Sequence, residues 1–421
     1  MMDRREAIRT AILGIGAATT STSLFKKLMV DETLHATVNT LNRKSDPFWQ
    51  LIKSQFNFED DILYFNHASL GSSPASVIEA TETFRRTLES YPSKYMWGGW
   101  DKQVDLVRRQ AAELLNTLED EIALIHNTTE GMNVVAASME LKPGDEVIVG
   151  NHEHRTATSP WLYHQKKKGI KIVRPELPIL PNSPDDIFNV YKNAITNKTR
   201  VISMVHLTNT NGMILPVNEI CKLANEKGIL TVIDGAQSMG AINCDMAETG
   251  CDFYTASGHK WLFSPKGIGI FYSKAERQDL LKPFIANRSY NRAGLAKIED
   301  YNTRNLPELL GLGAALEFHK LISLDAMKER ILHLRERFMQ GITRDDSLKI
   351  KTPLHPALSH QILTVEKTGM GVSELKNKLF EKHKIDVRGM SAHGLNGVRI
   401  SFSIYHDESD IDTIVDALKS V

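Results

Sequence analysis

Short apolar segments alternate with helical segments between residues 120 and 275, and this alternation restricts the possible folds more than any other feature of the chain. Segments that predict strands lie at 122–125, 146–150, 170–173, 201–206, 230–233 and 268–272, with helical segments such as 217–227 between several of them. Their continuous apolar character is typical of strands that are buried on both faces. We therefore expect an α/β fold with a mostly parallel sheet, whose ligands bind at the carboxyl ends of the strands.

The chain of 421 residues is too long for one small core, so we expect two domains. Residues 75–309 are predicted to form the large domain, after an N-terminal arm and loop at 29–74. Residues 310–421 are predicted to form a smaller α+β domain. Its helical patterns lie at 310–321, 325–340 and 373–383, and its strand patterns at 385–389 and 397–404.

Charge and cysteine content exclude several classes of function. The formal net charge is zero, which argues against a nucleic-acid partner. The three cysteines, Cys221, Cys244 and Cys251, are too few for a disulfide framework. Their spacing is also not that of a metal motif.

Residues 1–28 predict a targeting segment. Arg4 and Arg5 precede a weakly apolar stretch rich in Ala, Gly, Thr and Ser, as in an export signal. The adjacent arginines indicate the twin-arginine route, so we expect an exported, periplasmic enzyme. The alternative is a cytoplasmic enzyme with an amphipathic N-terminus. The stretch is too short and too polar for a permanent membrane span, and no other apolar run approaches the necessary length.

Two polar residues, Asp234 and Lys260, each follow an apolar strand segment. Asp234 ends the segment at 230–233, and Lys260 lies in a turn after a short strand that begins near Cys251. A lysine amine and a carboxylate are the pair that pyridoxal phosphate chemistry requires. The amine forms a Schiff base with the aldehyde, and the carboxylate keeps the pyridinium nitrogen protonated. By local sequence alone, Asp234 could equally be a helix N-cap, and the lysine a solvated surface charge.

A third strand end carries a candidate anion site. Residues 127–133 follow the strand at 122–125 and open a helix. The backbone N–H groups of a helix N-terminus, together with the hydroxyls of Thr128 and Thr129, can bind a phosphate. Taken alone, the segment is a capping motif.

In order along residues 64–405, these motifs resemble those of the class V aminotransferase-like group of fold-type I pyridoxal-phosphate enzymes. Cysteine desulfurases and isopenicillin N epimerase are members of that group. The segment Ser257-Gly-His259-Lys260 is similar to the lysine motif of the family, and Asp234-Gly-Ala-Gln237 to its pyridine-nitrogen motif. The resemblance implies the fold-type I architecture, bound pyridoxal 5′-phosphate, a homodimer, and a small substrate of the amino-acid type.

The resemblance also implies a role for each candidate near the cofactor. Lys260 would bind the cofactor covalently and then act as the base, Asp234 would pair with the ring nitrogen, and Gln237 would approach the ring hydroxyl. His154 would stack on the ring. The alternative is that His152 and His154 are metal ligands, although no further Cys or His lies nearby at ligand spacing. The remaining cofactor contacts would come from Thr128, Thr129, Ser257 and His259 at the phosphate and from Asn209 near the 3′-oxygen.

On the substrate side, Arg399 is similar to the arginine that holds the α-carboxylate, for which a guanidinium fork is well suited. An arginine on a strand is otherwise a solvent-facing charge. Asn66 and His67 lie where the epimerase-like branch lines the substrate pocket. Thr303 falls where family members carry a Gly-Thr turn that reaches the phosphate of the partner subunit, and Asn302 replaces that glycine.

The chain departs from the desulfurases at residues 388–396, the loop between two strands of the small domain. Desulfurases place a nucleophilic cysteine there, and this loop has none, so a persulfide mechanism is not expected. Our hypothesis is an isopenicillin-N-epimerase-like enzyme that deprotonates Cα of an amino acid or of an amino-acid-bearing metabolite. The alternatives are a class V aminotransferase or carbon–sulfur β-lyase acting on a modified peptide or siderophore-like metabolite. An alternative of another class is a catalytically inactive binding protein with this fold.

Overall fold

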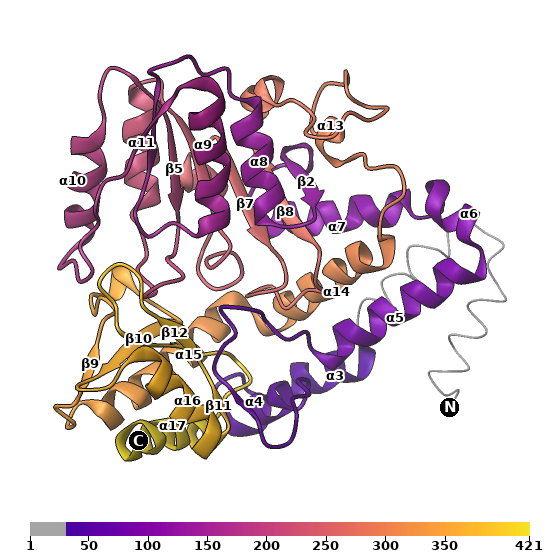
Figure 1. Ribbon diagram of the computed structural model, residues 1–421. Coiled ribbons are helices and arrows are strands. Elements are labelled where there is room, and N and C mark those ends of the chain that lie inside the picture. The colour runs from indigo at the N-terminus through magenta and orange to yellow at the C-terminus, as the bar shows by residue number, and fades with distance from the viewer. Residues whose placement is uncertain (1–30) are drawn as a thin grey trace.

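A seven-stranded β-sheet forms the centre of the computed structural model, which describes residues 31–421 (Figure 1). In spatial order, its strands are β2 (Ile122–Ile125), β8 (Gly269–Ser273), β7 (Phe253–Ser257), β6 (Leu230–Asp234), β5 (Thr199–Val205), β3 (Glu146–Val149) and β4 (Lys171–Val173). Neighbouring strands are parallel except that β8 runs antiparallel to both β2 and β7. The predicted α/β fold with a mostly parallel sheet is confirmed.

Alternate residues of this sheet face two separate apolar cores, as the two-residue period of a strand requires. In β3, Val147 and Val149 belong to one core, whereas Ile148 belongs to the other. The first core lies under α8 (Thr128–Ser138), α9 (Arg155–Lys168) and α13 (Ala296–Glu299). The second lies under α7 (Asp101–Leu114), α10 (Pro184–Ala194), α11 (Val217–Glu226), α12 (Met246–Thr249) and α14 (Leu306–Ile322). Burial on both faces explains why these strands are continuously apolar.

A second sheet of four strands lies in the C-terminal part of the chain, below the first sheet in Figure 1. Its antiparallel strands, in spatial order, are β12 (Arg388–Met390), β13 (Gly397–Ser401), β10 (Ile362–Lys367) and β9 (Leu348–Ile350). The helices of this part are α15 (Leu324–Ile342), α16 (Val372–His383) and α17 (Glu408–Ser420). The sequence analysis predicts α15, α16, β12 and β13, but not β9, β10 or α17.

The N-terminal segment is hydrogen-bonded to the C-terminal part of the chain. Strand β1 (Leu63–Tyr64) pairs in parallel with β11 (Ile385–Asp386). The helices around this strand are α3 (Glu32–Thr40), α4 (Asp46–Lys53) and α5 (Ala75–Ser90). The boundaries of the arm and of the two domains stay a prediction. The predicted export signal lies outside the described residues. Among residues 31–421, no helix is long and apolar enough to cross a membrane.

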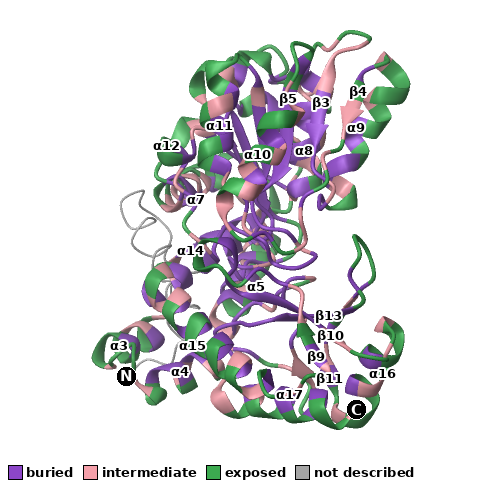
Figure 2. Cartoon of the chain, turned by 90° about the vertical axis from the view of Figure 1, so that its left-hand side faces the viewer, coloured by how far each residue is buried: buried purple, intermediate pink, exposed green. Residues whose placement is uncertain are grey.

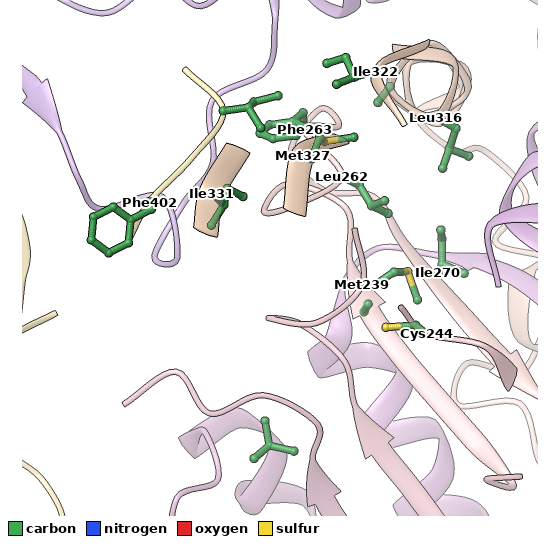
Figure 3. Close-up of a cluster of buried hydrophobic side chains, with 14 of the residues drawn as sticks. Met239, Cys244, Leu262, Phe263, Ile270, Leu316, Ile322, Met327, Ile331 and Phe402 are labelled. Carbon is green, nitrogen blue, oxygen red and sulfur yellow. The ribbon is translucent and has the colours of Figure 1, made fainter. Parts of the chain in front are cut away.

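One apolar core extends from Ile270 of β8 to Phe402, which follows β13 of the second sheet (Figure 3). Leu262 and Phe263 follow the lysine and pack into the same core as Leu316 of α14 and Met327 of α15. Figure 2 shows the same arrangement as a buried interior that continues from one sheet to the other. A rigid core therefore supports the lysine from behind.

Candidate active site

A cavity of about 700 Å³ lies at the carboxyl ends of β3, β4, β5 and β6. Segments that follow these strands form much of its wall, and β12 and β13 with the loop between them form another part. Five of the predicted residues line it: His154, Asn209, Gln237, Lys260 and Arg399. Strand ends of a parallel sheet meet at one edge, which explains why residues far apart in sequence converge here.

Lys260 lies in the turn after β7, and the loop at residues 66–71 holds that turn from behind. The Gly71 N–H donates to the His259 carbonyl oxygen at 2.9 Å. A Cβ at Gly71 would lie 2.6 Å from this oxygen, so the approach requires glycine. Among the described residues, the Lys260 amine has no hydrogen bond or ion pair. Burial lowers the pKa of Lys260 to about 8, although the Asp234 carboxylate opposes this shift.

Asp234 is the last residue of β6 and is only 3% exposed. Its Oδ1 accepts from the Ala236 N–H at 2.9 Å. Burial raises the pKa of Asp234, and the Ala236 N–H, Lys260 and His154 oppose the shift. Gln237 is fixed at both ends of its amide, because Nε2 donates to the Ala68 carbonyl at 2.7 Å and Oε1 accepts from Trp261 at 2.8 Å.

The predicted phosphate residues gather where α8 begins beside the end of β7. The Thr128 N–H donates to Ser257 Oγ at 2.9 Å, and the two hydroxyls are also 2.9 Å apart. Thr129 is exposed, and its N–H has no partner among the described residues. Burial and the neighbouring lysines lower the pKa of His259 to about 4, so its ring is neutral near pH 7. This helix N-terminus offers free donors to an anion.

Thr303 is exposed and does not line the cavity of its own chain. The Tyr301 hydroxyl donates to the Glu130 carboxylate, which places this turn beside the first turn of α8. Asn302 has a φ of 62°, a left-handed conformation that favours glycine. Asn302 therefore has a backbone conformation that a glycine would adopt without strain.

Arg399 projects from β13 and is 2% exposed. Its Nη1 donates to the Asn209 carbonyl oxygen at 2.8 Å and its Nη2 to Ser69 Oγ at 2.6 Å, while Nε has no partner. Among residues 31–421 no carboxylate forms an ion pair with it. Burial, reinforced by Arg388, lowers its pKa to about 9. A buried cation without an anion is costly, so this position suits an anionic ligand.

The structure does not bring Asn66 or His67 into the lining of the cavity. Asn66 accepts from Arg399 Nη2 at 3.4 Å, so it contacts the predicted carboxylate-binding residue from behind. His67 is fully buried, with Nδ1 3.2 Å from the Tyr405 hydroxyl and Nε2 3.0 Å from the Lys260 carbonyl oxygen. His67 therefore supports the backbone of the lysine turn. Ser69, from the same loop, lines the cavity instead.

Glu153 lines the cavity and was missed by the sequence analysis. Its Oε1 accepts from the Val205 N–H at 2.8 Å, and its buried Oε2 has no partner among the described residues. Burial, reinforced by Asp234, raises the pKa of Glu153 well above its usual range. The neighbouring histidines point to different partners, His152 to Thr210 at 2.7 Å and His154 to Thr156 at 2.7 Å.

These residues fit pyridoxal phosphate. An amine of lowered pKa and a buried carboxylate with one unshared oxygen lie at neighbouring strand ends, and the unpaired Thr129 N–H lies in the first turn of α8 beside the end of β7. Burial and Lys260 hold the pKa of His154 below its usual range, so its ring is neutral and able to stack on an aromatic ligand.

Comparison with known proteins agrees with this fit. The aminotransferase class-V family model matches residues 63–414. Isopenicillin N epimerase of Amycolatopsis lactamdurans is 26% identical over 392 residues, which cover 89% of this chain and 98% of the relative. A probable cysteine desulfurase of Pyrococcus abyssi is 25% identical over 407 residues, covering 88% of this chain and 96% of the relative.

Two solved structures show the same fold. The cysteine desulfurase of Escherichia coli has a TM-score of 0.77 and 24% identity, with 87% of this chain and 96% of that chain covered. A mutant of a cystine C–S lyase, with glycine covalently linked to its PLP cofactor, has a TM-score of 0.78 and 21% identity, covering 87% and 99%. The chain therefore belongs to the aminotransferase class-V family and is a pyridoxal-phosphate-dependent enzyme.

Proposed function

We propose that this enzyme removes the α-proton of an amino acid, or of a metabolite that carries one, in the manner of an isopenicillin-N-epimerase-like enzyme. One observation carries the proposal: the Lys260 amine and the buried Arg399 guanidinium, which has no anionic partner among residues 31–421, line the same cavity. Between them they offer a base and a carboxylate site.

Each group has a defined task in this reaction. The Arg399 fork binds the α-carboxylate and thereby places Cα near Lys260. With a pKa of about 8, Lys260 is partly neutral near pH 7 and accepts the α-proton at Nζ. The bound cofactor supplies an electron sink for the charge left on Cα. Asp234 holds negative charge at the ring-nitrogen side, and Gln237 is locked in place beside it.

The positions of the cysteines argue against a sulfur-transfer reaction. The loop at residues 388–396 contributes to the cavity wall but contains no cysteine. Cys221, Cys244 and Cys251 are all buried, and burial raises the pKa of each thiol. A buried thiol of raised pKa is a poor nucleophile. We therefore favour chemistry at Cα over a persulfide mechanism.

The test is incubation of the holoenzyme with a panel of amino acids in D₂O. We expect deuterium at Cα with loss of optical purity and without keto-acid formation. Keto-acid formation would assign an aminotransferase, and release of a β-substituent would assign a lyase. A protein that shows no visible absorbance with the cofactor and no exchange with any amino acid would be a binding protein, which would overturn the proposal.

We further propose that the active unit is a homodimer in which Thr303 reaches the phosphate site of the other subunit. Its exposed position on a turn outside its own cavity supports this role. Sedimentation would give the oligomeric state, and weaker cofactor affinity in Thr303→Ala would support the contact. Export by the twin-arginine route also stays a proposal, tested by replacing Arg4 and Arg5 and locating the protein in cell fractions.

A further inference from the structure

The cavity carries far more positive than negative charge. Its ionisable lining residues are Glu153, His154, Arg155, Arg174, Lys260, Arg388, His393 and Arg399. The one carboxyl group among them, Glu153, is buried with its Oε1 bonded to the Val205 N–H, and burial raises its pKa well above its usual range. One arginine is sufficient for an α-carboxylate, and this cavity has four.

Three of these arginines come from separate elements. Arg155 begins α9, Arg174 follows β4, and Arg388 begins β12. All three are exposed, and none forms an ion pair with a described residue. Arg174 makes a single 3.4 Å contact with the Gly150 carbonyl oxygen. By contrast, the exposed Arg337 on α15 is paired with Asp412 through two bonds of 2.7 and 2.6 Å.

Packing brings the segments of Arg174 and Arg388 to the same side of the cavity. A Cβ at Gly394, in the loop after β12, would lie 3.0 Å from the Ile179 side chain, in the segment after β4. His393 of the same loop packs against His152, with ring centroids 4.7 Å apart. Arg174 and Arg388 therefore lie on one side of the cavity that Arg155 also lines, and these three arginines are called the rim below.

We propose that the natural substrate carries a second carboxylate, and that Arg155, Arg174 and Arg388 bind it while Arg399 binds the α-carboxylate. This inference rests on the proposed function for the role of Arg399. An anion bound among three unpaired guanidinium groups forms charge-assisted hydrogen bonds with them. A neutral side chain would leave those groups unpaired, so the rim selects acidic substrates.

The test compares pairs of amino acids that differ in the second acidic group. The pairs are L-aspartate with L-asparagine, L-glutamate with L-glutamine, and L-2-aminoadipate with L-norleucine. The measurement is the rate of Cα deuterium exchange by the holoenzyme. We expect at least one acidic member to exceed its neutral partner in kcat/KM by roughly tenfold to a hundredfold, as expected for charge-assisted hydrogen bonds. Equal rates for every pair would overturn the inference and leave the proposed function intact.

Substitution of each of the three arginines tests whether it contributes to the preference for acidic substrates. Arg155→Gln, Arg174→Gln and Arg388→Gln should each lower the ratio of acidic to neutral kcat/KM, whereas Arg337→Gln is the matched control and should leave it unchanged. An unchanged ratio in all three rim variants would overturn the assignment of these residues.

A binding measurement separates the inference from catalysis. Calorimetric titration of the holoenzyme with glutarate and with pentanoate compares two ligands of equal length that lack an amine. We expect tighter binding of glutarate, and a smaller difference in the rim variants. Preferential glutarate binding without exchange of any amino acid would support the anionic rim while contradicting the proposed function. Equal binding of the two acids would overturn the proposal that the three arginines bind a second carboxylate.

Discussion

The two sides of the cavity differ in how completely their polar groups are paired. On the cofactor side, Gln237 is held at both ends and Thr128 is bonded to Ser257. On the substrate side, the guanidinium groups of Arg155 and Arg388 have no hydrogen-bond or ion-pair partner among residues 31–421, and the Arg399 Nε is buried without one. Apart from the Lys260 amine and the Thr129 N–H, the polar groups named on the first side are paired within the protein, whereas those on the second side gain their partners with the ligand.

This difference predicts how the two sides respond to substitution. Changes on the cofactor side should affect every substrate equally, because they alter a common step. Changes on the substrate side should discriminate between substrates, because they remove a contact that only some ligands make. The predictions below run from the largest expected effect to the smallest.

Lys260→Ala should abolish the visible absorbance of the bound cofactor and lower turnover by several orders of magnitude. The substitution removes the covalent attachment and the base together, and such units lose most of their activity when one member is removed. Absorbance spectra and Cα exchange rates are the measurements. Lys320→Ala, at an exposed lysine paired with Glu113, is the control. Appreciable exchange in the Lys260 variant would show that another residue is the base.

Asp234→Asn should lower kcat by about a hundredfold or more, as expected for loss of a preorganised charge. Asparagine retains an oxygen for the Ala236 N–H, so the strand end is preserved. Cofactor affinity, measured by equilibrium dialysis, should fall as well. The loss should be the same for acidic and neutral substrates. A rate equal to that of the parent enzyme would exclude a role for Asp234 at the ring nitrogen.

Arg399→Lys should cost about 2–5 kcal/mol in kcat/KM for α-carboxylate substrates, because a point charge replaces a planar fork. The loss should be smaller for amines that lack the carboxylate. Steady-state kinetics on matched acid and amine pairs provides the measurement, and Arg337→Lys controls for the chemistry of the exchange. Equal losses for both kinds of substrate would make Arg399 a structural residue.

The rate at which the cofactor-free protein takes up pyridoxal phosphate should rise about tenfold between pH 7 and pH 9. Burial disfavours the ammonium form of Lys260, so its pKa falls to about 8 and the reactive neutral amine increases through this range. Stopped-flow absorbance measures the rate. Asp234 opposes the shift, so the transition should move to lower pH in Asp234→Asn. A rate that is independent of pH would contradict a lowered pKa.

Ser69→Ala should have the smallest effect, a rise in KM of several-fold to about tenfold with little change in kcat. It removes one acceptor, 2.6 Å from Arg399 Nη2, which positions the guanidinium. Ser72→Ala, in the same loop and without a hydrogen bond to a described residue, is the control. A fall in kcat at constant KM would contradict this positioning role.

Most of the central sheet could be predicted because each strand is an uninterrupted apolar run. Strand β9 could not, because it has only three residues, whereas β10 begins with an apolar run, ILTV, that the sequence analysis missed. The antiparallel direction of β8 is likewise absent from its local sequence. By contrast, α17 had a local signal, since Asp407 and Asp410 form a capping box before apolar residues at helical spacing.

Within the site, residues at strand ends were predictable as a group because strand ends meet. The burial of Glu153 was not, because an acid between two histidines has no sequence sign of an apolar environment. His67 was expected in the pocket, but its ring fills the space behind the lysine turn. The convergence of Arg155, Arg174 and Arg388 depends on how the second sheet sits against the first, which local sequence does not encode.

The contact between Ser69 and Arg399 joins residues 330 positions apart. During synthesis the N-terminal loop leaves the ribosome long before β13 exists, and β1 likewise waits for β11. Forming such long-range contacts costs the entropy of closing most of the chain into one loop. They therefore form late in folding. A chain truncated before residue 385 would retain every strand of the seven-stranded sheet but have no Arg399 to hold a carboxylate. The substrate site is therefore complete only after synthesis has reached the C-terminal strands.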